Sequence, residues 1–329
     1  MMETQQDCEL ITEPFLEGWL WDSNTSLDKE VEISLLVEKP CLNELLVAAH
    51  SAQKVDPMTS LDPRDFELES CRALAEKIRS VLDHGAGFVI INDFPIKQFD
   101  DDTVRRIYWL LMSLLSRPVA QRFNGELVYD VVDEGVEPVL GKGIRSSKTA
   151  VRQVFHTDNH VCPPQYVALL CLHTAKSGGQ SGLINLYTVY NQLLDGHRET
   201  IPRMYKPFLF DRQKEHALED KLVSRNPIFE VNNGRLEVRV ATSLIRQGYK
   251  LTGAELDIET TEALDALDEV MEAPGLGKTF DFKPGQIQIV NNKRIGHRRT
   301  DFLDWPEAER KRHLLRLWLR DQGAPSFLG

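Results

Sequence analysis

The feature that most constrains the fold is the stretch 154–158, which places an imidazole and a carboxylate two residues apart. If this stretch is a β-strand or a strand end, His156 and Asp158 point to the same side, because side chains alternate along a strand. A second histidine, His297, follows the alternating run 285–292 much further along the chain. Two imidazoles and one carboxylate form the nitrogen and oxygen set that suits non-haem Fe(II), with one face of the ion left open. A shared ion therefore requires a fold that brings these two distant strands together.

A second constraint comes from Arg312 and Arg316, which stand in the alternating basic and apolar stretch 311–320. Such alternation is typical of a strand with one polar face. An arginine in an apolar strand needs an anionic partner, because an unpaired charge removed from water is costly. The planar guanidinium matches a carboxylate in a bidentate way that lysine cannot copy. A dicarboxylate cofactor would supply this partner.

The composition limits the classes of function. Of the 329 residues, 42% are hydrophobic, which is enough for a globular core and too many for a disordered chain. The net charge of −11 argues against binding to nucleic acid or to anionic membranes. The acidic start has no secretory pattern, and no apolar run approaches the ~20 residues of a membrane span. Five cysteines without a C-x-x-C pair indicate reduced thiols, so we predict a cytoplasmic protein.

The order of the predicted elements indicates one fold class. Many short strand-like runs are separated by Gly and Pro turns, and a few amphipathic helices accompany them. We therefore predict a mainly β fold with flanking helices, a double-stranded β-helix or jelly roll, rather than a parallel α/β fold. Residues 61–329 are predicted to form this domain, and residues 1–60 an extension that packs on it or covers it.

Several elements follow from periodicity and turn residues. Helices are predicted near residues 68–82, with Gly85 as the cap, from about residue 102 to 114, and at 261–271. Buried strands are predicted at residues 87–91 and 166–172, and a hairpin about Asn233-Gly234.

Taken together, these motifs resemble the taurine dioxygenase and clavaminate synthase-like (TauD/TfdA-type) family of Fe(II)/2-oxoglutarate-dependent oxygenases. The matching motifs lie between residues 85 and 325 and are His156-Thr157-Asp158, Gly178-Gly179-Gln180-Ser181, Asn292, His297-Arg298-Arg299-Thr300 and the strand from Arg312 to Arg316. The resemblance implies that Fe(II) and 2-oxoglutarate are cofactors and that O₂ is a co-substrate. It also implies that succinate and CO₂ are released.

The resemblance further implies roles for individual residues. The iron ligands would be His156, Asp158 and His297. Arg312 would bind the distal carboxylate of 2-oxoglutarate, assisted by Ser181 at a position where the family often has threonine. Arg316 would face the substrate or the other end of the cofactor. Halogenases of this type lack the carboxylate ligand, so an intact Asp158 favours hydroxylation or a related oxidation.

The substrate is predicted to be a small molecule, such as an amino acid or a specialised metabolite. The candidate contacts are Asn159, Arg145, Arg152 and Arg316, with Ser146, Gln153 and His160 as further candidates. A solvated basic loop or a hydrogen bond at the rim explains most of these residues at least as well. Residues 211–213 are compatible with a surface turn alone.

Two other functions stay open at this point. Two histidines and an aspartate also hold Zn²⁺ in hydrolases, although no general base is evident here and Arg312 would have no role. A non-catalytic jelly-roll binding protein is the third interpretation. No partner besides a small molecule is expected, and homo-oligomers are compatible with the sequence.

Overall fold

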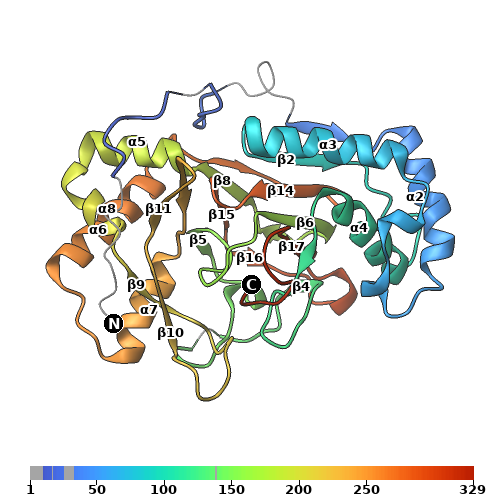
Figure 1. The fold of residues 1–329 in the computed structure, drawn as a ribbon. Coiled ribbons are helices and arrows are strands. Elements are labelled where there is room, and N and C mark those ends of the chain that lie inside the picture. The colour runs from blue at the N-terminus through green and yellow to red at the C-terminus, as the bar shows by residue number, and fades with distance from the viewer. Residues whose placement is uncertain (1–9, 17, 26–32, 138) are drawn as a thin grey trace.

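The chain folds around two β-sheets of unequal size (Figure 1). The computed structural model describes residues 10–16, 18–25, 33–137 and 139–329. Within these residues the larger sheet has the strand order β1-β2-β14-β6-β17-β3, and β4 also pairs with β17. Its strands are β1 (Ser34–Leu36), β2 (Phe88–Asn92), β3 (Pro118–Val119), β4 (Tyr129–Val132), β6 (Tyr166–His173), β14 (Ile287–Asn291) and β17 (His313–Leu319).

The smaller sheet has the strand order β13-β8-β15-β5. Its strands are β5 (Gln153–His156), β8 (Ser181–Asn185), β13 (Lys278–Phe280) and β15 (Ile295–Arg299). Three two-stranded pairs complete the described strands. They join β7 (Ser177–Gly178) to β16 (Phe302–Leu303), β9 (Phe208–Asp211) to β10 (Val223–Asn226), and β11 (Phe229–Asn232) to β12 (Arg235–Val238).

The helices form two groups at opposite ends of the molecule (Figure 1). One group is α2 (Lys39–Ala52), α3 (Glu69–His84) and α4 (Asp101–Leu115), which share a core with the larger sheet. The other group is α5 (Leu186–Gly196), α6 (Ile201–Met204), α7 (Thr242–Thr252) and α8 (Ile258–Glu272), which form a second core with β9, β11 and β12. The two sheets therefore lie between two helical layers.

The alternation of side chains in β17 explains how one strand serves both a core and a site. Leu315, Leu317 and Leu319 pack in the core shared with α2, α3 and α4. Trp318 belongs instead to a cluster that includes residues of β8 and β15 from the smaller sheet. Since side chains alternate along a strand, Arg316 points to the same side as Trp318, toward the space between the sheets.

The elements predicted from periodicity are found with small shifts at their ends. The three predicted helices correspond to α3, α4 and α8, and Gly85 follows α3 as predicted. Helix α4 begins after Asp100, whose side chain accepts a hydrogen bond from the backbone N–H of Thr103 at 2.8 Å. The buried strands are β2 and β6, and the hairpin joins β11 to β12. Its turn residues Asn233 and Gly234 have φ of 51° and 73°, as a tight turn of this kind requires.

Part of the predicted extension 1–60 lies outside the described residues. Residues 33–52, which are described, join the main fold, because β1 pairs parallel with β2 and Leu45 is buried in the core shared with α3 and α4. The domain boundary near residue 61 stays a prediction.

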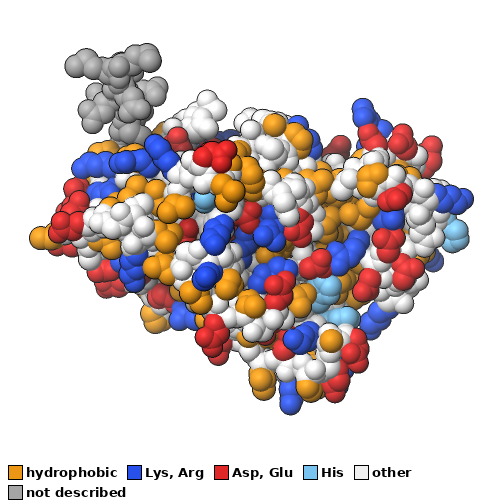
Figure 2. Space-filling model, turned by 90° about the horizontal axis from the view of Figure 1, so that it is seen from below, with side chains coloured by type: hydrophobic (Ala, Val, Ile, Leu, Met, Phe, Trp, Pro, Cys, Tyr) orange, Lys and Arg blue, Asp and Glu red, His pale blue; other side chains and the backbone are white. Residues whose placement is uncertain are grey.

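The structure confirms that helices flank β-sheets, in a mixed α and β fold with several sheets. None of the helices in the described ranges has the length and apolarity to cross a bilayer, while the cytoplasmic location stays a prediction. On the face shown in Figure 2, lysine and arginine side chains gather near the middle beside acidic ones, although the net charge of the chain is −11.

Candidate metal centre and its two cavities

Two histidines face each other across a pair of strands in the smaller sheet. Strand β5 ends at His156, and the residue opposite it in β15 is His297. The centroids of the two imidazole rings are 4.4 Å apart. The register shifts between His297 and Arg299, and irregularities of this kind re-aim side chains next to active sites. The fold therefore brings together the two distant histidines, as the sequence predicted.

Asp158 lies just beyond the end of β5, in a segment held by residues from other parts of the chain. The side chain of Asn292 accepts a hydrogen bond from the backbone N–H of Asp158 at 2.8 Å and donates to its carbonyl at 2.9 Å. One residue earlier, the backbone N–H of Thr157 donates to the carbonyl of Val240, and the N–H of Val240 donates to Thr157 Oγ1. These contacts fix the direction in which the Asp158 side chain leaves the backbone.

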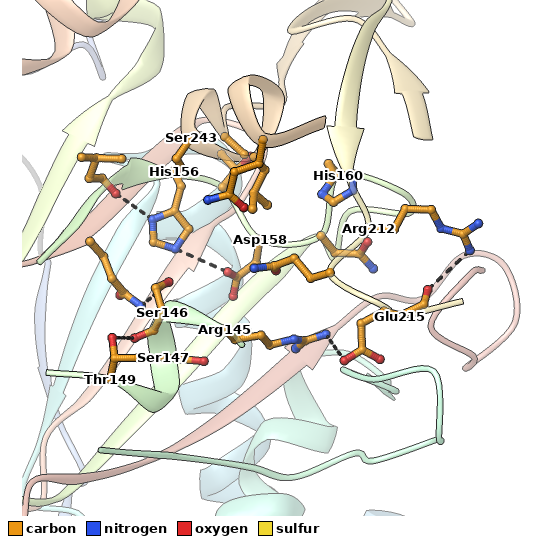
Figure 3. A pocket seen from close by; sticks show the side chains of 18 of the residues that line it. Arg145, Ser146, Ser147, Thr149, His156, Asp158, His160, Arg212, Glu215 and Ser243 are labelled. Carbon is orange, nitrogen blue, oxygen red and sulfur yellow. Dashed lines mark hydrogen bonds and ion pairs between the residues drawn. The ribbon is translucent and has the colours of Figure 1, made fainter. Parts of the chain in front are cut away.

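The three side chains converge on one point. Asp158 Oδ1 lies 3.7 Å from Nε2 of His156 and 3.7 Å from Nε2 of His297. One ligand atom from each residue lies within 4.8 Å of the others, so one metal ion fits between them. Figure 3 shows His156 and Asp158 turned toward each other at the wall of a cavity. Two nitrogen donors and one oxygen donor with open positions are the set that suits non-haem Fe(II).

The hydrogen bonds of the two rings determine which nitrogen is free for a metal. Nδ1 of His156 is 2.9 Å from the carbonyl oxygen of Val154. Because a carbonyl only accepts, Nδ1 donates a proton to it, and Nε2 is the ring nitrogen that faces Asp158. Nδ1 of His297 is buried and has no hydrogen-bond partner in the described part of the chain. Burial and the neighbouring His156 lower the pKa of His297 to about 3, so its ring is neutral, as a ligand must be.

The other oxygen of Asp158 is held by two side chains from β17. Trp318 Nε1 donates to Asp158 Oδ2 at 2.7 Å, and Nη1 of Arg316 lies 3.1 Å from the same oxygen. Burial alone raises the pKa of Asp158, but the Arg316 charge, the two histidines and the Trp318 hydrogen bond together hold it well below its usual value. The carboxylate is therefore ionised, with Oδ1 directed at the histidines.

A small cavity on one side of the three residues is lined by both histidines and by Arg312, Arg316 and Ser181. The Arg312 guanidinium is buried and has no ion pair or side-chain hydrogen bond to the described residues. Burial lowers the pKa of Arg312 to about 10, which shows the cost of keeping this charge out of water. Ser181 Oγ donates to Gln288 Oε1 at 2.5 Å. An anion in this cavity would find an unused guanidinium.

The paired glycines before Ser181 explain how the Arg312 side chain lies so close to the backbone of this turn. Gly179 has a φ of 72°, and a Cβ built on it would lie 3.1 Å from Arg312 Nε. A side chain at this position would be strained and would push the guanidinium away. The turn therefore has a structural role beside the cavity.

Arg316 lines both the small cavity and a larger one on the other side of the three residues. Besides its contact with Asp158, its Nε donates to Gln121 Oε1 at 2.7 Å. The two arginines of the predicted strand thus differ, because the Arg316 side chain has hydrogen-bond and ion-pair partners, whereas the Arg312 guanidinium, among the described residues, contacts only the ring of Phe302, 5.4 Å from its centroid.

The larger cavity has a volume of about 270 Å³ and contains the predicted substrate contacts in its lining. Arg145 is largely buried and forms an ion pair with Glu215 at 3.0 Å. Arg152 is half exposed and pairs with Glu272 at the surface. Asn159 has a φ of 53°, and its side-chain oxygen accepts two backbone N–H groups, so it also shapes the turn after Asp158.

Several residues that line the larger cavity were not predicted as site residues, among them Trp318, Arg212 and Glu215. Trp318 could have been found, because it stands two residues after Arg316 in a strand and therefore points to the same side. Arg212 and Glu215 follow β9, where the sequence is compatible with a simple surface turn. Nothing in the local pattern indicates that this turn closes one wall of the cavity (Figure 3).

Solved structures of iron oxygenases share this fold. Asparagine oxygenase superposes with a TM-score of 0.65 at 19% sequence identity, covering 88% of this chain and 94% of that chain. The non-haem iron oxygenase OrfP, solved with (3S)-hydroxy-L-Arg, gives a TM-score of 0.63 at 15% identity over 88% and 94% of the two chains. At this level of identity the likeness establishes the fold.

Sequence comparison identifies one relative over nearly the full length, another over half of the chain, and the family itself. FR-33289 synthase of Streptomyces rubellomurinus is 26% identical over 326 residues, which cover 97% of this chain and 94% of that protein. A taurine hydroxylase-like protein, SAT17, of Stachybotrys chartarum is 31% identical over 168 residues, covering 50% of this chain and 41% of that protein. The model of the taurine catabolism dioxygenase TauD, TfdA family matches residues 52–318. The protein therefore belongs to the TauD/TfdA family and is an Fe(II)/2-oxoglutarate-dependent dioxygenase.

Proposed function

We propose that this dioxygenase hydroxylates, or otherwise oxidises, a C–H bond of a small polar molecule such as an amino acid or a specialised metabolite. The observation that carries the proposal is the convergence of His156, Asp158 and His297 on one point beside two separate cavities. One cavity would hold the cofactor and the other the substrate, with the metal between them.

The donor set fits a ferrous ion held by His156, Asp158 and His297. Nε2 of His156 faces Asp158, the His297 ring is neutral, and Asp158 is ionised. His297 and Asp158 are therefore in the protonation state that metal binding requires. Trp318 and Asn292 would keep the carboxylate in place, since residues that hydrogen-bond to a metal ligand orient it and tune the affinity for the metal.

The small cavity fits 2-oxoglutarate. Arg312 would bind the distal carboxylate, because its buried guanidinium has no anionic partner among the described residues. Ser181 would lie beside this carboxylate, with its hydroxyl shared with Gln288. Arg316, which lines both cavities, would face the substrate or the keto-acid end of the cofactor.

When bound, the ferrous ion and 2-oxoglutarate use O₂ to supply the oxidation, and succinate and CO₂ are the by-products. The residues of the chain bind and orient the reactants. Apolar side chains in the lining of the small cavity, among them Leu169, Phe282 and Leu314, exclude water from the cofactor. Arg316 and Trp318 keep Asp158 charged and directed at the ion.

The substrate class is supported by the size and polarity of the larger cavity. A volume of about 270 Å³ suits a small molecule, and its lining is rich in arginine, serine and glutamine side chains. Among the solved relatives, asparagine oxygenase and OrfP are described with hydroxylated amino acids. A polar, amino-acid-sized substrate is consistent with both observations.

We also propose that the two sheets correspond to the two halves of a double-stranded β-helix. The support is the set of side chains from β6, β14 and β17 of one sheet that cluster with those from β8 and β15 of the other. Family membership makes a zinc hydrolase or a non-catalytic binding protein the weaker interpretation.

The test is a screen of small polar metabolites for stimulation of succinate release by the protein loaded with Fe(II) and 2-oxoglutarate. A substrate should raise succinate formation and O₂ consumption together. His297→Ala should show neither response. Succinate release that does not depend on Fe(II), or that survives in His297→Ala, would contradict the proposal.

A further inference from the structure

Two buried cysteines face each other between helices α2 and α3, which pack together at one end of the molecule (Figure 1). Cys41 lies in the first turn of α2 and Cys71 in the first turn of α3, and their Sγ atoms are 2.6 Å apart. Both cysteines are free. A sulfur–sulfur bond is ~2.05 Å long, so the two atoms are about half an ångström from bonding distance. The pair therefore differs from buried cysteines that only fill space.

A carboxylate of α2 fixes how the two helices meet. Oε1 of Glu44 accepts the backbone N–H of Ser70 at 2.8 Å, and Oε2 accepts that of Cys71 at 2.9 Å. Glu44 stands three residues after Cys41, on the same side of α2. Because it binds N–H groups that the first turn of a helix leaves without partners, it holds the start of α3 against α2. The two sulfurs are thus held in contact before any reaction.

A cavity of about 410 Å³ opens beside one cysteine of the pair. Cys41 lines it together with Ser34, Leu36 and Lys77, which are exposed, so the cavity reaches solvent. Cys71 is not among the described residues that line it. A small molecule that enters from solvent would therefore meet the Cys41 sulfur first.

The surroundings of Cys71 suit the second step of a thiol exchange rather than the first. Its contact with Cys41, its burial and the Glu44 carboxylate together raise the pKa of the Cys71 thiol well above its ordinary value. Since the thiolate is the attacking species, Cys71 reacts slowly with molecules from solution. It needs only to reach a sulfur that already touches it, and proximity of this kind offsets a low fraction of thiolate.

We propose that Cys41 and Cys71 are a redox site, at which a small disulfide oxidant converts the two thiols into a disulfide bond that joins α2 to α3. Cys41 attacks the S–S bond of the oxidant, which releases one small thiol and leaves a mixed disulfide. Cys71 then attacks the Cys41 sulfur, and the second small thiol leaves. The protons of both cysteines end on the released thiols, so two protein thiols are oxidised while one small disulfide is reduced to two thiols.

The bond would stabilise the helical layer without changing the metal centre. It closes a loop between cysteines 30 residues apart, and for a chain of this length the restricted unfolded state should raise the midpoint of thermal unfolding by about 5 °C. Both cysteines belong to the core that α2, α3 and α4 share with the larger sheet, and neither is among the described residues that line the two cavities. In a reducing compartment the pair would stay as thiols until an oxidant arrives.

The test uses the full chain loaded with Mn(II) and 2-oxoglutarate, with oxidised glutathione as the probe. After incubation the remaining thiols are alkylated, and the protein is digested and analysed by mass spectrometry without reduction. Peptides joined through Cys41 and Cys71 should appear and should separate again after treatment with dithiothreitol. The midpoint of thermal unfolding should be about 5 °C higher in the oxidised sample, while the affinity for 2-oxoglutarate should be equal in both samples.

Three variants separate the two steps. Cys71→Ser should stop the reaction at a glutathione adduct on Cys41, and Cys41→Ser should leave the Cys71 thiol free. Cys162→Ser removes a cysteine outside the pair and should leave both the cross-link and the rise in the midpoint unchanged. The measurement on the wild-type chain does not depend on whether the first two variants fold.

Three results would overturn the redox site. They are both thiols free in the wild-type chain after incubation with excess oxidised glutathione, a lasting glutathione adduct on Cys41 beside a free Cys71, and loss of the cross-link in Cys162→Ser. A cross-link that leaves the midpoint of unfolding unchanged would remove its stabilising role.

Discussion

The arginines that line the two cavities beside the metal centre differ in whether they have ion-pair partners. In the small cavity Arg312 lies on a strand of the larger sheet, is buried, and has no anionic partner in the described chain. In the larger cavity Arg145 and Arg212 lie on connecting segments and are held by Glu215. The comparison indicates that the small cavity depends on one unshared charge, whereas the larger cavity depends on a network. Single substitutions should accordingly have sharper effects in the small cavity.

The largest effect is expected at the centre that both cavities share. His297→Ala removes an iron ligand. Because loss of a residue that only hydrogen-bonds to a ligand costs up to ~100-fold, turnover should fall by more than ~100-fold, while the fold is kept. The measurements are succinate release and circular dichroism. His50→Ala, a change of an exposed histidine on α2, is the control. Activity near the wild-type level in His297→Ala would remove this residue from the iron site.

The second largest effect is expected at Arg312, the buried arginine without an ion-pair partner. Arg312→Ala should weaken 2-oxoglutarate binding at least about 30-fold, because truncating one partner of a buried charge pair costs about 2 kcal/mol or more. Calorimetric titration with Mn(II) bound measures the affinity. Arg310→Ala changes a neighbouring surface arginine and should have no effect. Unchanged affinity in Arg312→Ala would mean that the cofactor is held elsewhere.

A smaller effect is expected from loss of the hydrogen bond that Trp318 donates to Asp158. Trp318→Phe keeps the ring and loses the Nε1–H that donates to Asp158 Oδ2 at 2.7 Å. Iron affinity should fall about 10-fold to 100-fold, measured by competition with a chelator. Trp109→Phe removes a similar bond to the carbonyl of Leu61, far from the site, and serves as the control. Equal iron affinities in the two variants would show that Trp318 only fills space.

The smallest effect is expected at Ser181. Its hydroxyl proton is engaged with Gln288, so Ser181→Ala should weaken 2-oxoglutarate binding only about 2-fold to 10-fold. The same calorimetric titration measures it, and Ser177→Ala, which changes an exposed serine of β7, is the control. A loss as large as that of Arg312→Ala would mean that the hydroxyl turns away from Gln288 to bind the cofactor directly.

The metal-binding residues and the arginine proposed to bind the cofactor could be found from local spacing, because strands impose a period of two. His156 and Asp158 are two residues apart, and Arg312 and Arg316 stand in an alternating strand, so local spacing alone predicts which side chains share a face. The same rule would have found Trp318. The helices α3, α4 and α8 were also predictable, since their apolar residues recur with the helical period.

The wall of the larger cavity, in contrast, depends on contacts between distant segments. Glu215 and Arg212 follow β9, and Arg145 lies before β5, far away in the chain, yet one ion pair and one backbone hydrogen bond join them. No periodicity links such segments, because their positions depend on how the sheets and helices pack around them. Local spacing therefore predicts the residues of the iron site, whereas the packing of the connecting segments sets which groups line the larger cavity.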